Sequence, residues 1–167
     1  GRTRAVVSKI GALLHDVAKP ATKTIEPNGR IRFLGHPTLG AQMSEGVLRR
    51  LRFSNRELRM VSTMVEEHLR PGLISRGEDA PSRRALYRFF RDAGEVAVDT
   101  LFLNLADYLA ARGPRLEHDD WSEHCRLVGH VLHEGLEGKA PETLPKLISG
   151  HDIIGAFALE PGRQIGA

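Results

Sequence analysis

Apolar residues recur at intervals of three and four positions through most of this chain, which is the spacing of one face of an α-helix. Proline and glycine interrupt the pattern and mark where one helix ends and the next begins. With 167 residues, the chain is long enough for about one domain that buries its own core. The pattern therefore predicts an all-α fold, a bundle of about six to seven helices.

Turn and capping signals place the expected elements. We expect helices over about residues 6–19, 37–51, 54–70, 81–94, 95–112 and 117–136, with a short further helix beginning near 149 or 151. Pro20 is expected to stop the first helix, and Ser54 with Glu57 fits a capping box at the start of the third. Residues 23–33 lack helical spacing, and the turn signal Pro27-Asn28-Gly29 predicts a short hairpin or loop there.

The expected core is formed by the apolar positions that share the inner face of each helix. It comprises Val6, Ile10, Leu13, Leu14, Val17, Leu39, Met43, Val47, Leu48, Leu51, Leu86, Phe89, Phe90, Val98, Leu101, Phe102, Leu105, Leu109, Trp121, Cys125, Val128 and Leu132. Hydrophobic residues make up 41% of the chain and charged residues 27%, which is ordinary for a soluble globular domain.

Several function classes are excluded by what the sequence lacks. No apolar run approaches the length of a membrane span, and the start of the chain has no signal-peptide layout. The single cysteine, Cys125, excludes a disulfide framework and a cysteine-rich zinc site. Neither a phosphate-binding glycine loop nor a Gly-x-Ser-x-Gly nucleophile motif occurs. These features predict a cytoplasmic protein that does not bind a membrane.

Charge is distributed unevenly along the chain. The first 60 residues contain 12 basic and 4 acidic residues, whereas residues 117–167 contain 4 basic and 9 acidic ones. A basic segment rich in arginine suits phosphate or nucleic acid, because the guanidinium group can grip a phosphate with two donors. The alternative is that these arginines form an ordinary solvated surface and that their number reflects the codon bias of a GC-rich genome. The candidate RNA-binding residues are Arg49, Arg50, Arg52, Arg56 and Arg59.

Histidine directly before aspartate occurs three times, at residues 15, 118 and 151. Composition alone predicts about 0.4 such pairs, so the context of each pair has to decide its meaning. His15-Asp16 interrupts an apolar stretch, and a buried carboxylate is costly unless it is paired or bound to a cation. The alternative is that His15 and Asp16 lie on the exposed face of the helix and bind nothing. The other two pairs stand at expected helix starts, where acidic residues stabilise the free amides.

Other polar residues in apolar surroundings extend the first pair into a candidate site. Asp107 lies in a mostly apolar helix, His36 at a helix entrance and His68 at a helix exit. Together with His15 and Asp16 they offer three nitrogens and two carboxylates, a set that suits Mg, Mn, Fe, Co, Ni or Zn. Lys19 follows His15 by one helical turn, where its charge could meet an anionic substrate oxygen. His130 and His133 share a helix face and are expected to form an exposed pair.

The stretch from Leu13 to Pro20 resembles the signature of the HD domain superfamily, which contains all-α, metal-dependent phosphohydrolases. Further stretches, in order, resemble the HD region of the bacterial tRNA nucleotidyltransferase (CCA-adding enzyme) and poly(A) polymerase family. These are His15 to Thr22, Gly29 to Phe33 with Gly35-His36, Leu48 to Asn55, His68 to Pro71, Leu105 to Asp107, and Leu144 through Asp152 to Gly162.

The resemblance implies roles for the candidate residues. His15 and Asp16 match the metal-binding doublet and Asp107 the late aspartate that completes the metal shell, while His36 and His68 match positions that hold a second metal or contact phosphate. It also implies an HD domain over residues 1–116, followed by a helical extension over 117–167 that packs on it. Two parts of the family pattern do not occur in these residues: a histidine ligand on an earlier helix, since none of residues 1–14 is histidine, and the nucleotidyl-transfer head. Either the chain is a trimmed piece of a longer protein, or the site lacks this histidine.

Three functions follow as hypotheses. The first is the HD and tail-proximal part of a tRNA nucleotidyltransferase or poly(A) polymerase, binding a divalent metal and tRNA or other RNA. The second is a stand-alone HD phosphohydrolase that acts on a nucleotide or cyclic phosphate, with Lys19, His36 and His68 facing the substrate. The third is a metal-free scaffold for RNA or a protein partner. With only one nitrogen among its expected ligands, the chain alone is expected to show at most weak phosphoesterase activity.

Overall fold

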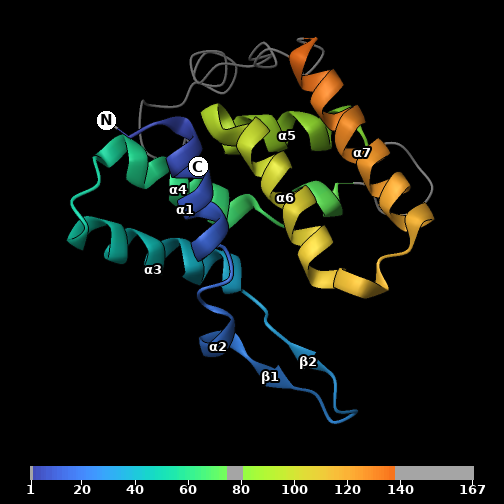
Figure 1. The fold of residues 1–167 in the computed structure, drawn as a ribbon, viewed down its shortest axis with the longest axis horizontal. Coiled ribbons are helices and arrows are strands. Elements are labelled where there is room, and N and C mark those ends of the chain that lie inside the picture. Colours follow the sequence, from blue (N-terminus) through green and yellow to red (C-terminus); the bar gives the residue numbers. More distant parts are fainter. Residues whose placement is uncertain (1, 75–80, 138–167) are drawn as a thin grey trace, which may run out of the picture.

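A computed structural model of the chain describes residues 2–74 and 81–137, and Figure 1 shows the arrangement of its elements. In chain order, the elements are α1 (Arg4–Leu14), α2 (Lys19–Thr22), β1 (Thr24–Ile25), β2 (Ile31–Arg32), α3 (His36–Arg50), α4 (Asn55–Glu67), the 3₁₀ turn η1 (Arg70–Leu73), α5 (Arg83–Ala93), η2 (Gly94–Val96), α6 (Ala97–Arg112), η3 (Gly113–Arg115) and α7 (His118–Leu136). The all-α prediction is confirmed. The helix expected near residues 149–151 lies outside the described residues.

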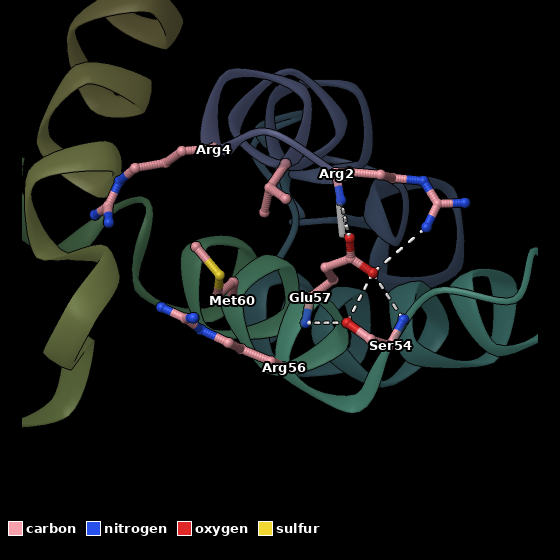
Figure 2. Close-up of a pocket in the computed structure, with 7 residues that line it drawn as sticks. Arg2, Arg4, Ser54, Arg56, Glu57 and Met60 are labelled. Carbon is pink, nitrogen blue, oxygen red and sulfur yellow. Dashed lines mark hydrogen bonds and ion pairs between the residues drawn. The ribbon is translucent and has the colours of Figure 1, made fainter.

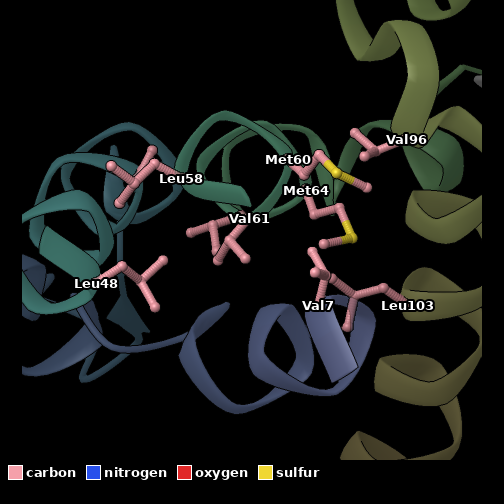
Figure 3. Close-up of a cluster of buried hydrophobic side chains, with 10 residues drawn as sticks. Val7, Leu48, Leu58, Met60, Val61, Met64, Val96 and Leu103 are labelled. Carbon is pink, nitrogen blue, oxygen red and sulfur yellow. The ribbon is translucent and has the colours of Figure 1, made fainter. Parts of the chain in front are cut away.

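The larger of two hydrophobic cores is centred on α4, which packs against α1 on one side and α3 on the other. Figure 3 shows side chains from these helices meeting one another, with Leu103 of α6 joining them. Leu48 of α3 and Val61 of α4 are completely buried, as the helical spacing predicted for Leu48. Burial of each such side chain contributes about 1.5–3 kcal/mol, so α3 and α4 are firmly held relative to each other.

The second core joins α5, α6 and α7 in the other part of the bundle. Its fully or nearly fully buried members are Leu86, Phe89, Ala93, Ala97, Leu101, Val128 and Val131. Ser82 caps α5 by accepting a hydrogen bond from the amide of Ala85, whereas the sequence pattern had suggested that Pro81 begins this helix. The two cores meet along α6, which contributes Leu103 to one and Leu101 to the other.

A two-stranded hairpin confirms the break in helical spacing at residues 23–33. Thr24 pairs with Arg32 and Ile25 with Ile31 in antiparallel register. Gly29 has a φ of 81°, which a side chain would disfavour, and the Asn28 side chain accepts a hydrogen bond from the amide of Arg30. The hairpin projects away from the helices (Figure 1), so both of its isoleucines are exposed.

The predicted first helix is wrong in its length. It ends at Leu14, so His15 and Asp16 lie in the turn that follows it rather than inside a helix, and Pro20 stands in the first turn of α2. Proline is well tolerated there, because the first helical amides have no partner within the helix. This turn matters for function, since a turn aims two consecutive side chains to one side more readily than a helix does.

Several expected core residues are exposed instead. The exposed set is Val6, Leu13, Met43, Leu51, Phe102 and Leu109. On α3 the inward positions before Leu48 are small or polar residues such as Gly40, Ala41 and Ser44, which allow the helix to approach its neighbours closely. Among the described residues no helix has the length and apolar character to cross a membrane.

The predicted capping box at the start of α4 is confirmed and has a wider role. Glu57 accepts hydrogen bonds from the amide and hydroxyl of Ser54 and also from the amide of Arg2, as Figure 2 shows. These donors, led by the Arg2 amide, lower the pKa of Glu57 from 4.5 to about 2. The carboxylate therefore ties the segment before α1 to the start of α4.

We expect the stabilising effect of Glu57 to depend on pH. Because the folded-state pKa is depressed, the ionised carboxylate stabilises the fold above about pH 4.5, and this stabilisation is lost as the pH falls toward about 2. Urea unfolding of Glu57→Gln and the unchanged protein should therefore differ most near neutral pH and converge in acid. A difference that is the same at every pH would contradict this assignment.

Candidate metal centre

Five of the residues singled out by sequence meet where α1, α3, α4 and α6 come together. His15 caps the end of α1 and Asp16 follows it, His36 is the first residue of α3, His68 caps the end of α4, and Asp107 lies on α6. His68 is completely buried and His36 nearly so, while the two carboxylates are partly exposed. The site thus has a buried imidazole side and a carboxylate side open to solvent.

The three histidine rings are oriented in the same way. Each Nδ1 lies within hydrogen-bond distance of the carbonyl oxygen three residues earlier: 2.8 Å for His15 to Ala12, 2.7 Å for His36 to Phe33, and 2.6 Å for His68 to Val65. A carbonyl can only accept, so Nδ1 carries a proton in each ring, and Nε2 is the atom that can bind a metal when the ring is neutral. Backbone carbonyls fix metal-binding histidines in this way in many proteins.

The three Nε2 atoms converge on Asp16. Its Oδ2 lies 3.1 Å from Nε2 of His15, and its Oδ1 lies 3.3 Å from Nε2 of His36 and 3.9 Å from that of His68. Ligand atoms of His15, Asp16 and His68 all lie within 4.8 Å of one another. This spacing fits donors that surround one ion at about 2.0–2.2 Å.

The same Nε2 atoms make further short contacts. Nε2 of His15 lies 3.4 Å from Oδ1 of Asp107, and Nε2 of His36 lies 3.4 Å from Nε2 of His68. Within the described part of the chain, Nε2 of His15 and Oδ1 of Asp16 are buried without a hydrogen-bond partner. Such an arrangement is unfavourable unless a cation lies between the atoms, since unpaired buried polar atoms are costly. The donor set therefore fits a divalent metal.

The charges and the burial at the site shift the pKa values of His15 and His68 in opposite directions. Asp107, together with the Ala12 carbonyl and Asp16, raises the pKa of His15 against the effect of its burial, and His15 in turn lowers the pKa of Asp107. Burial lowers the pKa of His68 and keeps that ring neutral. A neutral imidazole is the form that binds a metal.

Close packing of α3 brings His36 to the site. A Cβ at Gly40 would lie 3.1 Å from Cγ1 of Val65 and 3.7 Å from the carbonyl oxygen of His15. Glycine at this position therefore lets α3 approach both α4 and the end of α1. The completely buried Ala18 fills the space on the other side of this contact.

Lys19 is partly exposed and pairs with a carboxylate of the site. Its Nζ is 2.5 Å from Oδ2 of Asp16, and it lies 5.7 Å from the centroid of the Phe33 ring. The ammonium therefore holds Asp16 in place in this structure.

The five candidate RNA-binding arginines are exposed but lie apart from the metal centre. Arg49 and Arg50 are in the last turn of α3, the opposite end from His36, which for a helix of 15 residues is about 20 Å away. Two of the five are engaged by carboxylates: Arg49 with Glu45 at 3.7 Å, and Arg56 with Glu95 at 2.7 Å. Arg56, Arg2 and Arg4 are among the residues that line one pocket, as Figure 2 shows.

The remaining histidines fall into two groups. His118, His130 and His133 are exposed as expected, and Asp119 and Asp120 stand in the first turn of α7. His124 was missed by the sequence analysis: it is buried, and its ring stacks on Tyr108 with centroids 4.0 Å apart. Its spacing from Val128 and Val131, which places all three on one helix face, was the available signal. The pair at His151 lies outside the described residues.

Comparison with known proteins agrees with this geometry. Residues 3–112, about two thirds of the chain, match the HD domain family. The chain therefore belongs to the HD domain family.

Among curated proteins, the chain is 32% identical over 161 residues to the CC-adding tRNA nucleotidyltransferase of Thermus thermophilus, covering 95% of this chain and 33% of that protein. It is 33% identical over 155 residues to the A-adding tRNA nucleotidyltransferase of Deinococcus radiodurans, covering 92% of this chain and 34% of that protein. A bifunctional uridylyltransferase/uridylyl-removing enzyme of Bradyrhizobium is 31% identical over 86 residues, which cover 52% of this chain and 8% of that enzyme. The chain thus spans about a third of the length of its tRNA nucleotidyltransferase relatives.

Proposed function

We propose that this chain is the metal-binding HD part of a tRNA nucleotidyltransferase-like protein, and that it hydrolyses a phosphate ester at or near an RNA end. The observation that carries the proposal is the convergence of three oriented Nε2 atoms on Asp16, with Asp107 beside them. The relatives, which are tRNA nucleotidyltransferases, support RNA as the substrate class. We also propose that the HD part ends at residue 116, and the family match over residues 3–112 supports a boundary in this region.

The geometry leads us to propose more nitrogen ligands than the sequence suggested. His15, Asp16 and His68 would hold the metal, with Asp107 and His36 completing its surroundings. We thereby move His68 from a substrate contact to a metal ligand. A bound divalent metal would lower the pKa of a water molecule and polarise a phosphoryl oxygen.

The other residues of the site would orient the reacting groups. Lys19 would neutralise the carboxylate of Asp16 and attract an anionic phosphate toward the open side of the site. The Nδ1 hydrogen bonds would hold the imidazoles in place during turnover.

We expect the 167-residue chain to hydrolyse 2′,3′-cyclic nucleotides or simple phosphate esters when manganese, nickel, cobalt or magnesium is added. Activity should disappear with a chelator and return when metal is restored, because polarisation of the phosphoryl oxygen and activation of the water both need the ion. The measurement is phosphate or nucleotide release at matched protein concentrations. Metal binding without any hydrolysis would refute the hydrolase and leave a metal-stabilised scaffold.

We also propose that the arginines at residues 49–59 contact RNA phosphates. The exposed side chain of Arg50 makes no hydrogen bond or ion pair with other described residues, so Arg50 is suited to a single-residue test. Binding of tRNA should weaken steeply with salt. Arg50→Gln should make the slope of log affinity against log salt shallower by the amount that one phosphate contact contributes. A salt dependence unchanged by Arg50→Gln would place the RNA surface elsewhere.

A further inference from the structure

A pocket of about 290 Å³ opens beside the candidate metal centre, between η1, α6 and α7. Asp107 belongs to both: its carboxylate approaches His15, and it also lines the pocket. The pocket is tied to the centre at a second point, because Nδ2 of Asn104 donates a hydrogen bond of 2.9 Å to the carbonyl oxygen of His68. A ligand held at the metal would therefore have this pocket as its neighbouring space.

The floor of the pocket carries two polar atoms that the protein leaves unsatisfied. Oδ1 of Asn104 and Nε2 of His124 are both buried and have no hydrogen-bond partner within residues 2–74 and 81–137. Both side chains are more than nine-tenths buried and both line the pocket. Buried polar atoms without partners are rare in folded proteins, and at a pocket they indicate contacts made by a ligand.

The wall of the pocket is a stack of flat groups. The rings of His124 and Tyr108 lie nearly parallel, with an angle of 14° and centroids 4.0 Å apart. The guanidinium carbon of Arg112 lies 3.3 Å from the centroid of the Tyr108 ring, on which it forms a cation–π contact. Burial, and then the charge of Arg112, lowers the pKa of His124, so this ring is neutral near neutral pH.

We infer that this pocket binds the base of a nucleotide whose phosphate lies at the metal centre. A base is flat, uncharged and rimmed by hydrogen-bond donors and acceptors, which are the partners that Asn104 and His124 lack. The inference rests on the proposed function, since it assigns the second half of the substrate for the same site.

Other ligand classes fit the pocket less well. Arg112 is its one cationic lining residue among those described, and its guanidinium already lies against Tyr108, so a second phosphate would find little charge. An aliphatic chain would leave both buried polar atoms without partners, which costs binding energy. A second metal ion would find a single anionic ligand, the carboxylate of Asp107, beside the neutral donor atoms of Asn104 and His124.

Gly72 provides a way to fill the pocket without disturbing the fold. A Cβ at this position would lie 3.7 Å from Nδ2 of Asn104 and 3.8 Å from Cε1 of His124, which is ordinary van der Waals contact. The side chain of alanine would therefore fit in the folded protein and occupy the space in front of the two polar groups. Gly46 on α3 is the matched control, because a Cβ there meets nothing within 4 Å.

The test measures binding of adenosine, cytidine, guanosine and uridine, their monophosphates, and ribose 5-phosphate to the chain, with and without manganese. We expect the backbone amide of Gly72 and the side-chain amide of Asn104 to shift in NMR spectra on addition of at least one nucleoside, even without metal. Gly72→Ala should weaken binding of that nucleoside and its monophosphate by about tenfold or more. Gly46→Ala should bind both as the unchanged protein does, and neither variant should alter binding of ribose 5-phosphate with manganese.

A second variant tests the polar contact alone. His124→Phe keeps a ring against Tyr108 and removes Nε2, so it should weaken nucleoside binding while leaving the thermal midpoint equal or higher. The inference is overturned if no nucleoside shifts the pocket resonances, or if Gly72→Ala and His124→Phe bind monophosphates as the unchanged protein does. Failure of manganese to bind, with nucleoside binding intact, would instead refute the proposed metal-dependent function and leave the pocket standing.

Discussion

Replacing Asp16 by asparagine is expected to lower the affinity of the chain for manganese by at least about a hundredfold. Asp16 is the residue on which all three Nε2 atoms converge, and the amide would offer one neutral oxygen where the carboxylate offers two charged ones. Changes to groups that merely orient metal ligands already cost ten- to a hundredfold in affinity or activity, so loss of a charged ligand should cost more. Titration calorimetry with manganese measures the effect directly.

The chain contains a matched control for this experiment. Asp119 follows His118 just as Asp16 follows His15, but both side chains of that second pair are fully exposed in the first turn of α7. Asp119→Asn should therefore bind manganese as the unchanged protein does. Circular dichroism should show that both variants are folded. Equal affinities for Asp16→Asn and Asp119→Asn would mean that the metal, if bound, is not held at the proposed centre.

Metal binding should also appear as stability. A ligand that binds only the folded chain raises the free energy of unfolding by about 2.7 kcal/mol at a concentration a hundred times its dissociation constant. The thermal midpoint of the unchanged protein and of Asp119→Asn should thus rise with manganese, whereas that of Asp16→Asn should stay constant.

Sequence was informative about the site wherever the signal was local. A carboxylate beside a histidine in an apolar stretch is visible without a structure, and so is a lone aspartate such as Asp107 in an apolar helix. The orientation of the rings was not visible, because it depends on where α1 and α4 end. Each histidine reaches the carbonyl three residues earlier from a position at or beyond a helix terminus. Helix ends are the least certain part of a sequence-based prediction, so the role of His68 could not be assigned in advance.

The errors in the predicted core have a related cause. Helical spacing defines an apolar face but does not say which part of that face another helix covers. On α6, Leu101 and Leu103 meet different cores, whereas Phe102 lies between them on the outside and is 61% exposed. On α3 the close approach to α4 is made by Gly40 and Ser44, whose small size rather than apolar character allows it. A hydrophobicity pattern has no signal for that kind of contact.

The second core should be the most sensitive part of the fold to loss of a single side chain, and Phe89 is its largest member. The ring is completely buried between α5, α6 and α7 and lies 5.2 Å from the ring of Phe90 in an edge-to-face arrangement. Phe89→Ala removes these contacts and leaves a cavity, which typically costs about 3–5 kcal/mol of unfolding free energy. Urea unfolding followed by circular dichroism gives this quantity.

The same change at Phe102 separates the effect of burial from that of residue type. Phe102 is also an aromatic residue within a helix of this part of the bundle, but most of its surface is already in solvent. Phe102→Ala should therefore cost no more than about 1 kcal/mol of unfolding free energy.

If Phe89→Ala does not fold, Phe89→Leu, which keeps most of the volume, should fold with a loss of about 1–2 kcal/mol of unfolding free energy. Equal losses for the alanine variants at residues 89 and 102 would show that α5, α6 and α7 do not pack around Phe89, and the pocket that α6 and α7 form beside the metal centre would then lose its support.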